Sequence, residues 1–308
     1  MLKYVGKRIL MLIPVLIGVT LLIYWVLYLT PGDPVISILG TNASVEEVEA
    51  KRIELGLDKP FLVRYITYMG KVIRGDFGKS WFTGVSVIGE FKNRLPYTLK
   101  LAAMSMAISC IAGIPLGVMA AVRHNKPTDY ILTFLSMFFA SAPAFWLAMM
   151  MQLLFSVRLG WLPASGVGSF KHYVMPAFSL AAALLASMTR TTRNWLLENI
   201  RADYVRTARA KGARESRVIV LHALRNSLLP VITALGMTFA IILGGSVVIE
   251  RVYAYPGIGS YLIGAVKSTD VPIVMGCIIV LALLVGVVNL LTDLLYAVVD
   301  PRVKYGSA

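Results

Sequence analysis

The chain has 308 residues, of which 57% are hydrophobic and only 15% charged, and its mean hydropathy is +0.74. A chain this apolar exceeds what a water-soluble fold can bury, so the composition excludes an ordinary soluble protein and favours a membrane protein. The net charge of +14 does not indicate a nucleic-acid-binding protein, because the lysines and arginines lie between apolar segments.

Six stretches are long and apolar enough for a membrane-spanning helix, which needs about 20 mostly apolar residues. The fourth is the shortest, and we expect its helix to continue beyond the membrane surface. The predicted fold is therefore an all-α membrane protein with six transmembrane helices. The predicted spans are Ile9 to Leu29, Tyr97 to Val122, Tyr130 to Val157, Tyr173 to Thr189, Asn226 to Ile249 and Val271 to Thr292.

The lysines and arginines in the short flanks predict the orientation. Sixteen lie on the side that holds both termini and the loop 190–225, whereas the opposite short loops hold four. The positive-inside rule therefore predicts that both termini and this loop are cytoplasmic. The predicted organisation is an N-terminal span (1–30), an extracytoplasmic segment with short helices (31–96), a five-helix core that contains the loop (97–300) and a cytoplasmic tail (301–308).

The outer segment contains helix signals and one misleading motif. Asn42-Ala-Ser44 precedes VEEVEAKRIELGL, and we interpret it as a helix N-cap in preference to a glycosylation sequon. FLVRYITYMGKVIRG has apolar residues at helical spacing. GDFGKS, at 75–80, resembles part of a phosphate-binding loop, but Ile73 stands where the first glycine is required, so no nucleotide site is predicted.

Polar residues inside the predicted spans are few. Ion-driven carriers use buried acids or histidines as relays, but these spans contain neither, and apart from Lys100 near the start of the second span, Gln152 and Asn289 are their largest polar side chains. Asn289, Asp293 and Tyr296 share one face of the last helix, and we expect them to form a structural polar cluster. The three histidines are scattered, so no metal site is predicted. The spans therefore contain no predicted device for coupling energy to transport.

Glycine and proline interrupt the second, third and fifth spans, at 113–117, at Ser141-Ala-Pro143, and at 236 and 244–245. Small residues allow close helix packing, and proline frees a backbone carbonyl that a neighbour or a cavity can satisfy. The pattern fits either tight packing or a translocation path whose walls tilt.

The most basic loop reads RADYVRTARAKGARESRVIVLHALRNSLLP, at 201–230. We expect Asp203 to cap a short helix and Gly212 to end it. Acids interspersed among the basic residues argue against a loop that only contacts anionic lipid. Small residues leave a shallow surface that another protein could cover, which predicts a docking element. This surface contains Tyr204, Thr207, Ala208, Ala210 and either Lys211 or Gly212.

The Ala208 to Gly212 pattern, in a cytoplasmic loop between the fourth and fifth spans, resembles the EAA loop of ABC-importer permeases. DYVRTARAKG followed by HALRNSLLPVIT resembles its peptide-permease form. The resemblance covers nearly the whole chain. It extends to LTPGDP (29–34), LGLDKPFLVRY (55–65), GDFGKS (75–80), WLPASG (161–166), GGSVVIERVYAYPGIG (244–259) and DLLYAVVDPRVKY (293–305).

This resemblance implies the B-type permease subunit of a dipeptide, oligopeptide, glutathione or nickel ABC importer, with the type I (MetI-like) fold, in a bacterial or archaeal cytoplasmic membrane. Such a subunit is not an enzyme and binds no cofactor, because ATP and Mg²⁺ bind partner ATPase subunits. Peptide is the first choice of substrate, although nickel and glutathione permeases share these segments. The implied partners are a second permease, two ATPases, an extracytoplasmic binding protein and membrane lipid, with no nucleic acid.

The resemblance also implies roles for particular residues. Arg206 and Thr207 depart from the Glu and Ala of the general EAA pattern, and Pro256 to Gly259 should form a tight turn before a short helix. The ATPase-coupling helix would comprise Asp203, Tyr204, Arg206, Thr207, Ala208, Arg209, Ala210, Lys211 and Gly212. The extracytoplasmic gate, or contact with the binding protein, would comprise Tyr253, Pro256, Gly257 and Gly259.

Two other classes of function remain as remote alternatives. A stand-alone secondary carrier would need relay residues within the spans. An intramembrane enzyme would need paired carboxylates, a metal set or a nucleophile with its base, and the predicted spans show none of these.

Overall fold

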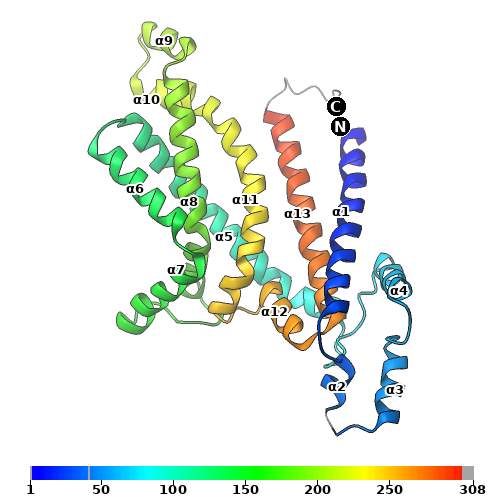
Figure 1. Cartoon of the computed structure of the whole chain (residues 1–308). Helices are drawn as coiled ribbons and strands as arrows, with labels where there is room; N and C mark the ends of the chain where they lie inside the picture. Colours follow the sequence, from blue (N-terminus) through cyan, green and yellow to red (C-terminus); the bar gives the residue numbers. More distant parts are fainter. Residues whose placement is uncertain (1, 41, 300–308) are drawn as a thin grey trace. The chain divides into compact units, whose positions relative to one another are not determined.

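The computed structural model describes residues 2–40 and 42–299, apart from the side chains of 2–4, 7, 228–235, 237 and 295–299. Within this described part every regular element is a helix, and one isolated antiparallel bridge joins Lys79 to Ser86. The chain divides into two compact units (Figure 1). The first takes the chain up to Thr98 together with Pro256–Gly286, and the second takes Leu99–Tyr255 together with the chain from Val287. The predicted tail, 301–308, lies outside the described residues.

Four helices in the described part are long and apolar enough to cross a membrane, and a bent helix pair could supply a fifth span. The four match the first, second, fourth and sixth predicted spans. The fourth continues past Thr189 as expected. The fifth predicted span lies within a 28-residue helix, some of whose side chains are outside the description, so the count of six and the orientation stay predictions. The candidate spans are Arg8–Leu29, Val87–Val122, Lys171–Ile200 and Val271–Leu294.

The third predicted span is a bent helix pair. Helix α6 (Pro127–Ser141) is followed by α7 (Ala144–Met151) and the π-helical η1 (Gln152–Arg158), with a bend of 103°. Ala142 is extended, with ψ of 124°, because the ring of Pro143 disfavours helical geometry in the residue before it. The bend therefore falls at the hinge that the sequence indicated.

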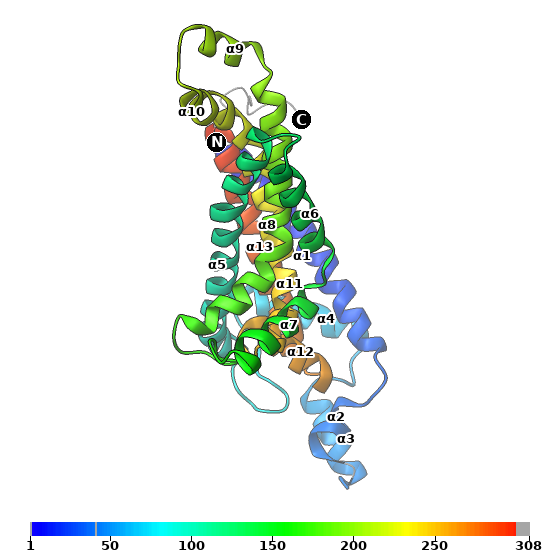
Figure 2. The same cartoon turned by 90° about the vertical axis from the view of Figure 1, so that its left-hand side faces the viewer.

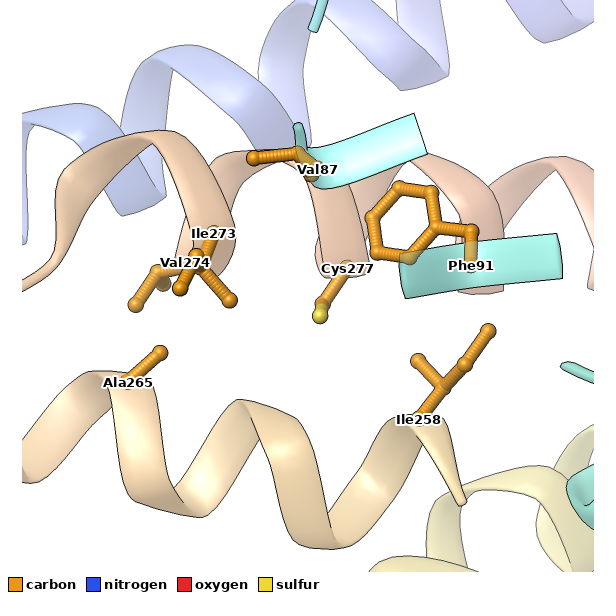
Figure 3. Close-up of a cluster of buried hydrophobic side chains, with 7 residues drawn as sticks. All are labelled: Val87, Phe91, Ile258, Ala265, Ile273, Val274 and Cys277. Carbon is orange, nitrogen blue, oxygen red and sulfur yellow. The ribbon is translucent and has the colours of Figure 1, made fainter. Parts of the chain in front are cut away.

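The first unit has a hydrophobic core at the meeting point of three helices (Figure 3). Ile258 and Ala265 point from one helix toward Val274 and Cys277 of the next, and Phe91 closes the cluster. The elements of this unit are α1 (Leu2–Leu29), α2 (Pro34–Leu39), α3 (Val45–Glu54), α4 (Phe61–Ile73), the start of α5 (Val87–Val122), α12 (Ile258–Ser268) and the first part of α13 (Val271–Val299).

The predicted helix signals of the outer segment are confirmed. The Ser44 hydroxyl accepts from the Glu47 amide at 3.2 Å, and the Glu47 carboxylate accepts from the Ser44 amide at 2.8 Å, which is a complete capping box at the start of α3. The last residue of GDFGKS has a structural contact, because the Ser80 hydroxyl donates to the buried Asp270 carboxylate at 2.6 Å.

The second unit is built around α8 (Lys171–Ile200), which packs against α6, α7 and α11. Glycine allows α5 to approach α8 closely, since a Cβ at Gly117 would lie 2.6 Å from the Thr189 carbonyl oxygen. Short helices α9 and α10 lie at one end of α8, and α7 lies by the other end (Figures 1 and 2). The remaining elements are α9 (Asp203–Ala210), α10 (Glu215–Arg217), π-helical η2 (Val218–Leu224) and α11 (Arg225–Val252).

Candidate functional site

Helix α9 is held on the second unit by its own small hydrophobic core. Val205 is fully buried and Ala208 is 8% exposed. They pack with Leu196 near the end of α8, and with buried apolar residues of η2 and of the end of α5. The α9–α10 hairpin, residues 203–217, is therefore a packed extension of the helical core. The cluster comprises Ala121, Leu196, Val205, Ala208, Val218 and Ala223.

Gly212 ends α9, as predicted, in a Schellman motif. Its φ of +78° is left-handed, a conformation that glycine adopts without steric cost. The Gly212 amide donates to the Arg209 carbonyl at 2.9 Å, and the Ala213 amide donates to the Ala208 carbonyl at 3.3 Å. A Cβ at Gly212 would meet nothing within 4 Å, so backbone conformation alone requires glycine here.

Two expectations for this helix are wrong. Ala202 is the N-cap of α9, and Asp203 is its first helical residue, with no side-chain cap bond. Asp203 instead places an acid in the first turn, where it favours the helix dipole. Ala208 does not contribute to an outer surface, because it faces the hydrophobic core of this same chain. Helical periodicity indicates which residues share a face but not which face turns inward.

The outer face of α9 is polar and strongly exposed. The Asp203 side chain is 98% exposed and that of Arg206 is 73% exposed, and their ion pair is long, at 3.8 Å. A pair with this exposure contributes little to stability. These side chains are therefore available to another molecule at little cost to the fold. Asp203, Tyr204, Arg206, Thr207, Arg209, Ala210, Lys211 and Gly212 are all exposed.

Arg209 has a structural partner within the hairpin. Its guanidinium donates to both carboxylate oxygens of Glu215, at 2.7 and 3.1 Å, and more weakly to the Ile200 carbonyl at 3.4 Å. The hydrogen bonds from Arg209 lower the pKa of Glu215 below its ordinary value of 4.5. The sequence placed Arg209 in the coupling helix but did not indicate that it joins α9 to α10.

Tyr204 connects α9 to the two long helices beside it. Its hydroxyl donates to the Asn199 side-chain oxygen at 2.5 Å. The Asn199 amide group in turn donates to the buried Ser227 hydroxyl of α11 at 3.1 Å. This chain of hydrogen bonds connects α9 to both α8 and α11.

A buried ion pair near this end of α8 was not predicted from the sequence. Arg193 donates from Nε to Oδ1 of Asp129 at 2.6 Å and from Nη2 to Oδ2 at 2.8 Å. The Asn125 amide donates to the same carboxylate at 3.1 Å, and His124 Nδ1 lies 3.1 Å from it. The Asp129 side chain is only 2% exposed. Arg193 lies one helical turn before Leu196, so the pair clamps α6 to α8 beside the core that supports α9.

This ion pair places two charged side chains in helices that extend beyond the predicted spans. Both residues lie in helices that qualify as spans, or as half of the bent pair. The predicted spans began at Tyr130 and ended at Thr189, just short of each residue. His124, one of the three scattered histidines, belongs to the same cluster. The two residues are 64 positions apart in the sequence, so no local pattern indicated that they pair.

The predicted gate residues are largely buried within the chain. Tyr253, 1% exposed, donates from its hydroxyl to the Ala148 carbonyl at 3.1 Å and shares a hydrogen bond of 3.2 Å with Ser179. Pro256 is half-buried, and Gly257 is the N-cap of α12, so the expected helix after the turn is confirmed. Gly259 is also buried, and whether these four residues form a gate stays a prediction.

The predicted polar cluster of the last helix is only partly described. Asn289 is exposed and Asp293 is half-buried on α13, while the Tyr296 side chain lies outside the described residues. Asp293 makes a polar interaction. Their association stays a prediction.

Two family models match the chain. The "Binding-protein-dependent transport system inner membrane component" family matches residues 113–305. Its N-terminal counterpart, "Binding-prot-dependent transport system membrane comp, N-term", matches residues 1–102. Together the two matches include the outer segment and the α9–α10 hairpin.

Among curated proteins, the glutathione transport system permease protein GsiC of Escherichia coli (strain K12) is 39% identical over 305 residues, which is 99% of this chain and 100% of that protein. Proteins of the same name from Shigella dysenteriae serotype 1 (strain Sd197) and Salmonella choleraesuis (strain SC-B67) match equally well. These relatives therefore match over their full length.

Two solved structures of the inward-facing MetNI methionine ABC transporter have a similar fold. The native CY5 crystal form gives a TM-score of 0.57 at 19% identity, covering 69% of this chain and 97% of the matched chain. The selenomethionine-soaked form gives 0.56 at 20% identity, covering 68% and 96%. At this identity the likeness shows the fold alone.

Proposed function

Because the chain belongs to the family of inner-membrane components of binding-protein-dependent transport systems, as a permease subunit of an ABC importer, we propose that it imports short peptides with energy received through α9. Its partners are a second permease, two ATPase subunits and an extracytoplasmic binding protein. The chain crosses the membrane six times, with both termini and the α9–α10 hairpin in the cytoplasm. Access alternates as the ATPases close and move the hairpins.

The observation that carries this proposal is the construction of α9. Its inner face is anchored on a core shared with α5, α8 and η2, while its outer face presents exposed, oppositely charged side chains. A helix held this way moves with the bundle instead of folding away when it is pushed. The hydrogen bonds from Tyr204 through Asn199 to Ser227 carry the same motion to α11.

The experiment compares two exposed arginines of the hairpin. Arg206→Glu reverses a charge on the proposed docking face, and Arg217→Glu makes the same change on α10, outside that face. We expect Arg206→Glu to lower uptake and the amount of ATPase that co-purifies with the permease by about tenfold, as for loss of one well-placed charged contact. Arg217→Glu should stay within about twofold of wild type. Equal effects of the two changes would contradict a specific docking face.

Glutathione is the second candidate substrate, and one observation favours it. The 39% identical relatives are named glutathione permeases, and glutathione is itself a short peptide. The nickel alternative rests on the sequence resemblance.

The identity of the substrate can be tested independently of the role of α9. The assay measures uptake of three labelled probes in cells that carry the complete importer. A dipeptide, glutathione and Ni²⁺ are supplied singly and then in competition. We expect the cells to take up the dipeptide, and we expect excess glutathione to suppress this uptake. We expect no uptake of Ni²⁺. Uptake of Ni²⁺ alone would overturn the peptide assignment while leaving the role of α9 intact.

A further inference from the structure

An apolar groove of about 530 Å³ runs along α1 where α4 packs against it. It is lined by Gly18, Leu21, Leu22 and Trp25 of α1 and by Phe61 and Leu62 of α4. Tyr28, near the end of α1, lines both this groove and a more polar cavity of about 430 Å³. Tyr28 therefore lies between an apolar groove and a polar cavity, which we call the polar mouth.

Helix α4 lies deeper than its place in the outer segment suggests. The hydroxyl of Tyr65 hydrogen-bonds to the Thr20 hydroxyl at 2.8 Å and reaches the Ile17 carbonyl at 3.3 Å. Thr20 precedes the end of the candidate span at Leu29 by nine residues, or about 14 Å of helix. Part of α4 therefore lies beside the spanning part of α1, at the depth of lipid chains.

The exposed side chains of α4 fit that depth. Leu62 and Ile66 are 61% and 66% exposed, and beside them on α1 Leu22 and Trp25 are 57% and 55% exposed. The groove is continuous with this apolar surface of a membrane-spanning helix. Side chains of this kind in water would form an unfavourable patch, whereas lipid chains cover them at no cost.

The polar mouth contains a positively charged group. The Arg64 guanidinium carbon lies 6.0 Å from the centre of the Tyr24 ring and 5.8 Å from that of Tyr28. Phe61 packs edge-on against Tyr28 at 5.3 Å and so supports the same aromatic cluster. No carboxylate of the described residues forms an ion pair with Arg64. Arg64 is held over the rings with its charge left for an anion.

The dimensions match one lipid in one leaflet. Gly18 and Tyr28 are ten residues apart, which is about 15 Å along a helix, or half of a hydrocarbon core about 30 Å thick. Aromatic rings at Trp25 and Tyr28 mark the interface, where headgroups begin. We propose that this groove is a phospholipid site, with an acyl chain between α1 and α4 and the phosphate on Arg64. Under the predicted topology the lipid comes from the outer leaflet.

The test uses the complete importer in lipid nanodiscs with two photoreactive probes: phosphatidylglycerol that carries a diazirine on its acyl chain, and the matching diacylglycerol, which has no phosphate. We expect the phospholipid probe to label peptides that cover 18–28 and 61–66. Excess inorganic phosphate should not compete, which distinguishes a lipid headgroup from a free anion. Labelling of both probes alike, or competition by phosphate alone, would overturn the proposal.

Two variants and a matched control make the test specific. Gly18→Leu places a larger side chain in the groove, at a position where an added Cβ meets nothing within 4 Å. Labelling should fall to about a fifth or less, since the leucine and an acyl chain cannot share the space. Gly6→Leu makes the same change on α1 outside the groove, also in open space, and should label as wild type does.

Arg64→Gln removes the charge and keeps the groove. Phosphatidylglycerol labelling should fall about tenfold, the loss expected for one charged hydrogen bond, to the level of the diacylglycerol probe. Wild-type labelling in Gly18→Leu would overturn the site. None of these readouts depends on substrate uptake.

Discussion

Two arginine–carboxylate ion pairs of this chain differ in their exposure to solvent. They are Arg193 with Asp129, and Arg209 with Glu215. Each arginine donates two hydrogen bonds to its carboxylate, at 2.6 and 2.8 Å in the first pair and 2.7 and 3.1 Å in the second. The Asp129 side chain is 2% exposed, and that of Glu215 is 58% exposed. The first pair clamps long helices together, whereas the second closes a small hairpin that is open to solvent.

The difference in burial sets what each pair contributes. Removing one partner of a buried pair leaves a charge without its counterion, which costs about 3–5 kcal/mol. An exposed pair is compensated by water when it breaks, and contributes about 0.2–1 kcal/mol. Under the proposed function the hairpin binds and releases another subunit, and weak internal contacts on its outer side suit that role. The support beneath it must stay rigid.

The largest effect is expected at the buried pair. Asp129→Asn should lower the free energy of unfolding by about 3–5 kcal/mol, because Arg193 keeps its charge in a largely buried place. Thermal unfolding of the detergent-solubilised protein can be followed with a thiol-reactive dye, which reaches Cys110 and Cys277 as the helices separate.

The matched control for this change is Glu215→Gln, which removes the carboxylate of the exposed pair. It should cost no more than about 1 kcal/mol. The double change Asp129→Leu with Arg193→Met removes both buried charges and should recover most of the lost stability. If Asp129→Asn and Glu215→Gln unfold at the same temperature, burial does not distinguish the pairs and the clamp is refuted.

Sequence patterns predicted the elements that depend on interactions between residues close together in the chain. Hydropathy located the first, second, fourth and sixth spans, Asn42-Ala-Ser44 indicated a helix N-cap, and Gly212 indicated a helix end. Each of these signals depends on residues a few positions apart. Pro143 likewise indicated a hinge. The bend angle could not be predicted from the local sequence, because it depends on what the two helix halves pack against.

Features that depend on tertiary packing were not predictable in the same way. The Asp129–Arg193 pair joins residues far apart in the sequence, and each lay just outside a predicted span. Ala208 belonged to a recognisable pattern, yet its side chain faces the core and not a partner. The candidate docking surface is therefore narrower than the sequence indicated, with Arg206 and Thr207 on the outside and Val205 and Ala208 as its support.

The smallest effect is expected at the exposed pair, and pH reveals it. The pKa of Glu215 is lowered in the folded hairpin, so its contribution is fully present above the ordinary value of 4.5 and is lost as the pH falls through the lowered pKa. Opening of the hairpin, measured by hydrogen exchange of 203–217 and corrected for intrinsic rates, should rise up to about fivefold on acidification from pH ~6 to ~3, which corresponds to about 1 kcal/mol. In Glu215→Gln the opening at pH ~6 should already match the acid value and change little with pH. Equal acid sensitivity in the two proteins would show that another group responds, and that the Arg209–Glu215 pair does not hold the hairpin closed.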